Sequence, residues 1–352
     1  MTNVARSALR PGERLGARWL LAGGFTVALT GLIGVAIGPV SIPIGQVLRE
    51  LLDRLPLIDI DTSLSETERT IVWDIRAPRA VLGLLVGALL AGSGAAYQGV
   101  FRNPLADPYL LGIAAGAGLG ATIAIVAEAR DSIGFVDPVP LAAFGGALLA
   151  VTVAGTLSVR RGRVGSPATL ILAGVAVANF FTAIQTFVQQ KNSGSLQQIF
   201  SWILGRLATA GWGEVRLILP YFIICAAGLL LSVGALDVLA VGDDEATTLG
   251  LRPKVARRTI LTLASLSAAA AVAVSGLIGF VGLVVPHAIR LTVGTSNRKV
   301  VPLSLLFGGA FLVLADVVAR TIQSPAELPI GVVTAFVGAP FFLIILRRQL
   351  AS

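Results

Sequence analysis

The sequence has few charged residues and almost none suited to metal or redox chemistry. Asp, Glu, Lys and Arg make up 13% of its 352 residues, whereas soluble proteins average about a quarter. The only cysteine, Cys225, excludes an intramolecular disulfide and a thiolate metal site. The only histidine, His287, has no ligand partners at metal-site spacing, so we interpret it as a hydrogen-bonded packing residue and expect no metal site. The phosphate-binding loop GxxxxGK(S/T) is absent, so ATP hydrolysis would belong to another subunit.

Long apolar runs dominate what the sequence does contain. Hydrophobic residues make up 55% of the chain, and the mean hydropathy is +0.86. Both values indicate a polytopic membrane protein. The net charge of +8 is spread over the ends of the apolar runs instead of gathering on one face. It therefore fits orientation in a lipid bilayer, and no nucleic acid is expected as a partner.

We predict an all-α fold of about ten transmembrane helices, preceded by a polar arm at residues 1–18. The first apolar run is too long for a signal peptide and is read as the first spanning helix. The polar segment 39–74 contains one amphipathic stretch, IGQVLRELLDRL. Residues 19–348 are expected to form a single transmembrane domain. The expected spanning helices are residues 19–37, 76–100, 109–127, 139–159, 167–189, 215–236, 259–274, 275–294 with a break near Pro286, 302–320 and 329–346.

An even number of crossings places both termini on one side of the membrane. More of the 27 lysines and arginines fall on that side than on the other. The positive-inside rule therefore predicts that both termini are cytoplasmic. The loop 237–258, the most distinctive polar interruption in the C-terminal half, is then cytoplasmic as well.

This loop contains the signal of a short helix from Asp243 to Leu249. Asp243 is expected to cap its first turn, and Gly250 to take the left-handed position after its last turn. Such a short helix needs a surface to pack on. Two interpretations remain open at this point: a linker helix resting on its own protein, or a projection that enters a partner.

A polar stripe marks the helix predicted at residues 167–189. Its members recur at helical spacing, so they share one face. Lipid offers such groups no hydrogen bonds, so the stripe must face other helices or water. It is either a set of interhelical hydrogen bonds or the lining of a passage for a bulky polar solute. The stripe comprises Asn179, Thr182, Thr186 and Gln189, with Gln185 beside it.

Three arginines lie at helix ends on the predicted outer side. Arg76, Arg79 and Arg320 either reach the lipid interface and pair locally, or meet an acidic partner surface. Asp316, four residues before Arg320, is the expected local partner. A carboxylate inside a membrane can also relay protons, but its position near the outer end favours the structural pair.

Seven motifs in one order resemble a known family of transport proteins. Together they are similar to the FecCD-type permease subunits of ABC importers for iron chelates, haem and cobalamin. The resemblance covers nearly all of the chain from Arg76 onward. The motifs are RAPR with its Gly-rich helix, RNPLADPYLLGIAAGAGLGA, LAGVAV, GDDEATTLGL, SGLIGFVGLVVPHAIRL, LADVVAR and ELPIGVVTAFVGAPFFLIIL.

The resemblance implies a type II ABC importer permease fold and a set of partners. These are a second permease subunit in a homodimer or a heterodimer, two ABC ATPase subunits and an extracytoplasmic substrate-binding protein. No cofactor would be bound by this chain, because ATP and Mg would bind the ATPase. The chain itself would not be an enzyme, and its location would be the cytoplasmic membrane of a bacterium.

The resemblance also implies functional residues. Arg76, Arg79 and Arg320 would receive acidic side chains of the binding protein. A cytoplasmic gate would comprise Asn103, Leu105, Ser166, Pro167 and Ala168, although some relatives carry adjacent Ser and Thr where this chain has Ser-Pro-Ala. The coupling helix that enters the ATPase would comprise Asp243, Asp244, Glu245, Ala246, Thr247, Thr248, Leu249 and Gly250.

The resulting hypothesis is an importer driven by ATP through alternating access. A ferric siderophore is the expected solute, with haem and cobalamin as alternatives. The competing function is a secondary transporter driven by an ion gradient. That function requires charged or coordinating residues near the middle of the membrane, and the sequence offers only Asp316 and Arg290.

Overall fold

The computed structural model describes residues 15–54, 62–128, 137–160, 163–164, 167–205, 207–208 and 210–350. Most of the predicted polar arm therefore lies outside the described residues. The elements in chain order are α2 (Ala17–Ala36), α3 (Ile44–Asp53), α4 (Glu66–Thr70), the π-helix η1 (Ile71–Arg76), α5 (Ala77–Phe101), the 3-10 helix η2 (Pro108–Leu111), α6 (Ile113–Val126), α7 (Pro138–Leu157), β1 (Val159–Arg160), β2 (Arg163–Val164), α8 (Pro167–Lys191), the 3-10 helix η3 (Ser193–Ser195), α9 (Leu196–Ile203), α10 (Trp212–Leu231), α11 (Val233–Val241), α12 (Asp243–Thr248), α13 (Pro253–Ser275), α14 (Val281–Val293), α15 (Asn297–Thr321) and α16 (Ile330–Leu350).

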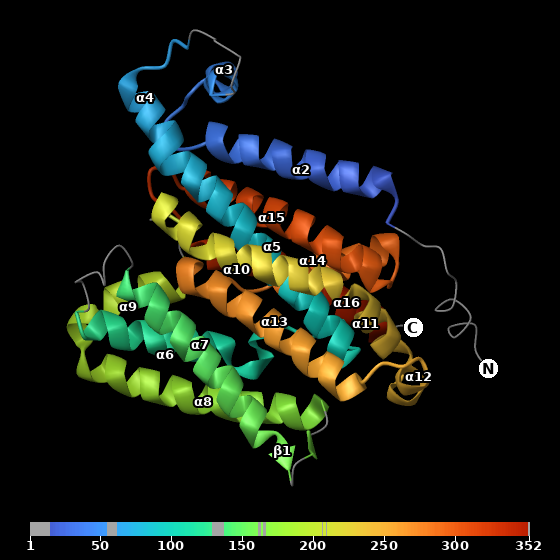
Figure 1. Cartoon of the computed structure of the whole chain (residues 1–352). Helices are drawn as coiled ribbons and strands as arrows, with labels where there is room; N and C mark the ends of the chain where they lie inside the picture. The colour runs from blue at the N-terminus through green and yellow to red at the C-terminus, as the bar shows by residue number, and fades with distance from the viewer. Residues whose placement is uncertain are drawn as a thin grey trace.

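The described helices confirm the prediction of an all-α membrane fold. Seven helical segments among them are long and apolar enough to cross a membrane, and three shorter apolar helices, α6, α14 and α16, accompany them. Their sum agrees with the ten expected crossings. The strands β1 and β2 form only a two-residue antiparallel ladder in the loop after α7. The start of α2 and the end of α16 lie at the same end of the bundle as α12 (Figure 1), as an even number of crossings requires.

Helix α5 forms the centre of the bundle. It packs against α2, α10, α13, α14 and α15, and almost all of its residues are buried. Gly87 makes this packing possible, because a Cβ there would collide with the backbone of Gly308 on α15. This close approach matches the small-residue spacing expected of packed membrane helices.

The segment leading into α5 is longer than the sequence suggested. Helix α4, η1 and α5 form one continuous helical segment from Glu66 to Phe101, whereas the predicted helix begins ten residues later, at Arg76. A capping box fixes the true start: the Ser65 hydroxyl accepts from the Glu68 backbone N–H at 3.3 Å, and the Glu68 carboxylate accepts from the Ser65 N–H at 2.8 Å. The Ser-x-x-Glu spacing of this cap is visible in the sequence.

A second group of helices lies beside this centre. Helices α6, α7 and α8 pack against one another, and α13 contacts both α7 and α5. Figure 1 shows α13 running between the two groups, with α8 on the outer edge of the bundle. The lining of any passage along α8 is therefore presented at the periphery of this chain.

The predicted break near Pro286 is wrong. The helix is interrupted earlier, at residues 276–280, and α14 then runs without a break from Val281 to Val293 through Pro286. Proline removes the N–H that would bond the carbonyl four residues before it. That carbonyl belongs to Gly282, and Gln98 Nε2 of α5 approaches it at 3.4 Å while donating to the Leu283 carbonyl at 3.2 Å. A side chain of a neighbouring helix thus takes over the lost bond.

Candidate functional site

Helix α12 is a small exposed projection. It lies at the end of the bundle where α2 starts and α16 ends (Figure 1). Ala246 is its only buried residue, and the neighbouring Leu249 is 60% exposed. The predicted C-terminal cap is confirmed. Gly250 has a φ of 82°, and the Leu251 N–H donates to the Ala246 carbonyl at 3.0 Å, which is a Schellman arrangement.

The predicted role of Asp243 as N-cap is wrong. Gly242 occupies that position and Asp243 is the first helical residue. Its carboxylate accepts hydrogen bonds from Arg102 at 2.9 Å and from Arg257 at 2.7 and 3.2 Å. Hydrogen bonding by Arg257, aided by Arg102, holds the pKa of Asp243 below its usual value. Charge pairing to other helices therefore outcompetes capping of its own helix.

Arg102 connects α12 to the central helix. It is the residue that ends α5, and it adopts a left-handed backbone conformation with a φ of 51°. Its Nε donates to the Leu239 carbonyl of α11 at 2.9 Å, while its Nη2 donates to Asp243. Arg257 belongs to α13. We call these three side chains, Arg102, Asp243 and Arg257, the α12 clamp, because they tie α12 to α5 and α13.

A second polar network starts on α11, the helix that leads into α12. It was not predicted from the sequence. Asp237 of α11 accepts from the Asn297 N–H at 2.6 Å and from the Ser296 hydroxyl at 3.1 Å. Asn297 in turn accepts from Arg290 at 3.0 Å, and Arg290 Nε donates to Gln98 at 3.3 Å. The network joins α11, α15, α14 and α5. Its sequence signal is a set of polar residues interrupting or ending apolar runs.

The predicted gate residues are only partly described. Asn103 and Leu105 lie in the turn after α5, where the Asn103 side chain accepts from the Leu105 N–H at 2.9 Å. Ser166 lies outside the described residues. Pro167 begins α8, and Ala168 is exposed. Whether the two groups close a gate stays a prediction.

The polar stripe on α8 divides into two parts. Asn179, Thr182 and Thr186 are exposed on the surface of the chain, and Gln189 is half-buried. Gln185 is instead buried, and its Nε2 donates to the Thr122 hydroxyl of α6 at 3.2 Å. In this structure Gln185 therefore serves as an interhelical hydrogen bond, while the exposed members remain able to line a passage.

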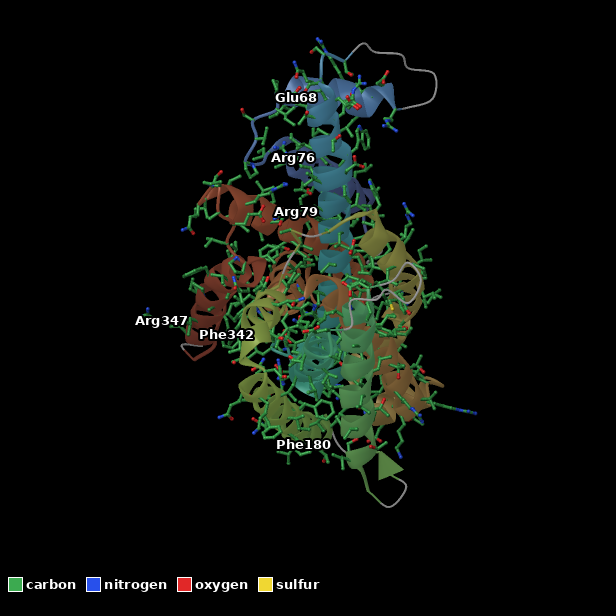
Figure 2. The ribbon with its side chains drawn as sticks, turned by 90° about the vertical axis from the view of Figure 1, so that its left-hand side faces the viewer. Glu68, Arg76, Arg79, Phe180, Phe342 and Arg347 are labelled. Carbon is green, nitrogen blue, oxygen red and sulfur yellow. The ribbon has the colours of Figure 1, made fainter. Side chains whose placement is uncertain are left out.

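The three outer arginines are buried, contrary to the exposure that the docking prediction needs. Arg76, Arg79 and Arg320 are each no more than 6% exposed. Arg76 donates to the carbonyls of Ala36 at 2.7 Å and of Val40. Figure 2 shows Arg76 and Arg79 along the helical segment below Glu68. In Figure 1 this segment starts with α4, at the end of the bundle away from α12.

Arg79 is the centre of an ion-pair cluster. It donates to both oxygens of Asp316 at 2.8 to 3.0 Å and to both oxygens of Glu327 at 2.9 Å. The predicted pair of Asp316 with Arg320 is present as a charge contact at 3.6 Å, but Arg320 donates its hydrogen bond to the Gly34 carbonyl. The cluster holds α2, α5 and α15 together, so the structure supports a bracing role, and docking stays a prediction.

An apolar cavity of about 640 Å³ opens between α9, the 276–280 interruption and α16. Phe280 and Phe336 are among its lining residues. The Gly331 N–H donates to the Leu204 carbonyl at 3.2 Å, so α16 is fixed to the end of α9 beside the cavity. The cavity gives this chain an apolar surface beside α9 and α16, large enough for part of an organic molecule.

Comparison with known proteins agrees with this architecture. Residues 26–348 match the FecCD transport family. The cobalamin import system permease protein BtuC of Halobacterium salinarum is 44% identical over 284 residues, covering 81% of this chain and 75% of the relative. The hemin transport system permease protein HmuU of Yersinia pestis is 41% identical over 301 residues, covering 82% of this chain and 86% of the relative.

A solved structure of similar shape supports the same grouping. It is a metal-chelate type ABC transporter in an inward-facing conformation, with a TM-score of 0.81 and 28% sequence identity. The similarity covers 95% of this chain and all of that chain. With a family match over most of its length and relatives above 40% identity, this chain belongs to the FecCD transport family.

Proposed function

We propose that this chain imports a ferric siderophore through a passage between two copies of itself, driven by a separate ABC ATPase that binds α12. As a FecCD member, the chain is a multi-pass membrane permease of an ABC importer for iron chelates, haem or cobalamin. The choice of a siderophore, of a homodimer and of α12 as the ATPase contact is the proposal.

The observation that carries the proposal is the construction of α12. Its outer surface is exposed and acidic in the first turn, while the α12 clamp joins it to α5 and α13. A partner that pushes on α12 would therefore move the central helix as well. In this arrangement ATP and Mg bind the ATPase subunit, and α12 lies in the cytoplasm with both termini.

The exposed part of the polar stripe supports a passage at the edge of the chain. Asn179 and Thr186 donate to carbonyls of their own helix, Val175 and Thr182 respectively. The side-chain donors of these two residues are therefore bonded within α8. The exposed face of the helix is then an uncharged polar surface. Such a wall lets a bulky polar solute slide without holding it, and a second copy of the chain would supply the facing wall.

Nothing in the family match supports the ion-coupled alternative. Two of the buried charged clusters are also already engaged. Arg79 pairs with Asp316 and Glu327, and Arg290 is hydrogen-bonded to Gln98 and Asn297. Groups engaged in this way are poorly placed to bind and release a coupling ion.

The proposal is tested in proteoliposomes. The tagged chain is purified from its native membrane with its bound chains, and a chain with a GxxxxGK(S/T) loop is sought by peptide sequencing. Uptake of a radiolabelled ferric hydroxamate siderophore, haem and cobalamin is then measured with and without ATP, in the presence of the cognate binding protein. ATP-dependent uptake of the siderophore supports the proposal. ATP-dependent uptake of only haem or cobalamin overturns the substrate, and uptake that needs an ion gradient overturns the ATPase mechanism.

A further inference from the structure

Helix α3 lies across the end of the bundle instead of running along it. Figure 1 shows α3 end-on beside the end of α2 that is away from α12, with α2 seen lengthwise. In the perpendicular view of Figure 2, α3 is seen lengthwise near the top of the molecule. Helix α3 therefore runs across the direction of the spanning helix α2, as a helix lying in the plane of the membrane that α2 crosses would do.

One edge of α3 is anchored to the protein. Val47 and Glu50 are buried, and the Glu50 carboxylate accepts from the Trp73 indole at 2.9 Å and from the Thr62 hydroxyl at 2.8 Å. Arg69 adds a charge contact to Glu50 at 3.3 Å. These contacts fix the rotation of α3 about its own axis, because its polar buried edge must face the segment that leads into α5.

The opposite side of α3 carries three large apolar side chains without a cover. Ile44, Leu48 and Leu52 are 53%, 39% and 41% exposed. They are spaced four residues apart, so they form one stripe along the helix. The stripe lies on the side turned away from the anchor at Glu50. A contiguous apolar stripe of this kind needs an apolar environment.

The position of α3 indicates what that environment is. Helix α2 packs one face on α15 and leaves Leu21, Phe25 and Leu29 exposed, as expected of a helix that faces lipid. Ile37 and Val40, in the connection from α2 to α3, are 38% and 48% exposed, so this apolar surface extends toward α3. Figure 1 shows α3 on the side of α2 that is away from α15. The stripe therefore lies over the same lipid that covers α2, and it continues the lipid-facing surface of the bundle.

Two arginines at α3 suit a headgroup region. Arg49 of α3 and Arg54, the residue that ends it, are exposed, and the Arg54 guanidinium lies 4.8 Å from the centre of the Trp73 ring. Exposed basic residues on a helix with an apolar stripe, one of them packed on a tryptophan, are typical of helices that lie in a membrane interface.

We propose that α3 is an interfacial helix that inserts Ile44, Leu48 and Leu52 into the bilayer leaflet at the end opposite α12. Arg49 and Arg54 then face the lipid phosphates. In the orientation proposed above, this is the extracytoplasmic leaflet. The inference depends on the chain spanning a bilayer, and it does not depend on the substrate or on the ATPase.

Spin labelling of the full chain tests this proposal. The label is placed at Leu48→Cys, in a Cys225→Ser background, after reconstitution into nanodiscs of phosphatidylcholine and phosphatidylglycerol. Arg49→Cys, on the neighbouring polar side, is the matched control. We expect the label at position 48 to collide with dissolved oxygen several-fold more often than with a water-soluble nickel chelate, and the label at position 49 to show the reverse order.

Equal access of the nickel chelate to both positions would overturn the proposal. So would a label at position 48 that becomes protected only when a binding protein is added, because a protein would then be the partner of the stripe. Leu52→Cys repeats the measurement if the first variant folds poorly. Failure of ATP-driven uptake in the earlier experiment would leave this result unchanged, so the two proposals are tested separately.

Discussion

The carboxylate of Asp243 accepts a 2.9 Å hydrogen bond from Arg102, a residue 141 positions earlier in the chain. Arg102 ends the central helix α5, and Asp243 begins the exposed helix α12. This contact joins the end of the most buried helix to the exposed surface of α12. In the proposed mechanism, it is the route by which force on α12 would reach the transmembrane bundle.

Removal of the Asp243 carboxylate from the α12 clamp should loosen α12 without unfolding the chain. Exposed ion pairs contribute about 0.2 to 1 kcal/mol each, so Asp243→Ala should raise amide hydrogen exchange in α12 several-fold. ATP hydrolysis by the bound ATPase should then continue with less solute moved per ATP. The matched control is Asp244→Ala, which alters an exposed carboxylate on the same helix. Equal exchange in the two variants would contradict the α12 clamp.

The two parts of the α8 stripe should respond differently to substitution. Thr182→Trp adds bulk to an exposed position, so we expect uptake to fall at least about tenfold while the melting temperature stays unchanged. Gln185→Leu removes the bond to Thr122 inside the protein, and the unsatisfied hydroxyl should cost about 1 to 3 kcal/mol of stability. Uptake and thermal unfolding of both variants check this division. A loss of stability in Thr182→Trp alone would refute it.

Arg79 should behave as a structural residue. Arg79→Ala leaves Asp316 buried without its main partner, and breaking a buried pair in this way costs about 3 to 5 kcal/mol. Arg79→Lys should give an intermediate loss, because lysine supplies the charge but not the planar fork that reaches both carboxylates. The check is thermal unfolding in nanodiscs. Arg79→Ala with unchanged stability and weakened binding-protein affinity would instead support docking.

The contacts that anchor α3 through Glu50 should loosen in acid. Burial alone would raise the pKa of Glu50, but bonds from Trp73 and Thr62 together with Arg69 hold it below the ordinary value of 4.5. A carboxyl with a lowered folded pKa stabilises the fold above its unfolded pKa and loses that effect as the pH falls through the folded value. The tryptophan fluorescence of the chain should therefore change only below about pH 4.5. The change should vanish in Glu50→Gln, and in Trp73→Phe if Trp73 is its source.

Much of the fold could be predicted from the sequence because hydropathy and helix breakers have local causes. The apolar runs predicted the spanning helices, and Gly250 predicted the end of α12. The helix break was predicted near Pro286 instead of at residues 276–280. Pro286 fits inside α14 because Gln98 of α5, far away in sequence, bonds the carbonyl that the proline leaves free. The early start of the helical segment at Glu66 was missed although the Ser65 capping box was present in the sequence.

The functional residues were harder to predict because charge pairing depends on contacts between distant segments. Asp243 looked like a cap, and only the fold shows Arg102 and Arg257 beside it. Asp316 was assigned to Arg320 by spacing along one helix, whereas its main partner, Arg79, is 237 residues away. Gln185 shares a helix with the exposed stripe, but its position relative to α6 decided its role.

Retention of the ATPase by an α12 variant tests the central claim most directly. Leu249→Arg places a charge on the exposed tip of α12, and Gln190→Arg makes a comparable exposed change at the other end of the bundle. Each tagged chain is purified in nanodiscs, and the ATPase bound per permease is measured together with its ATP hydrolysis. The account predicts that Leu249→Arg loses the ATPase while Gln190→Arg keeps it. Full retention and full ATP-driven uptake in Leu249→Arg would contradict it.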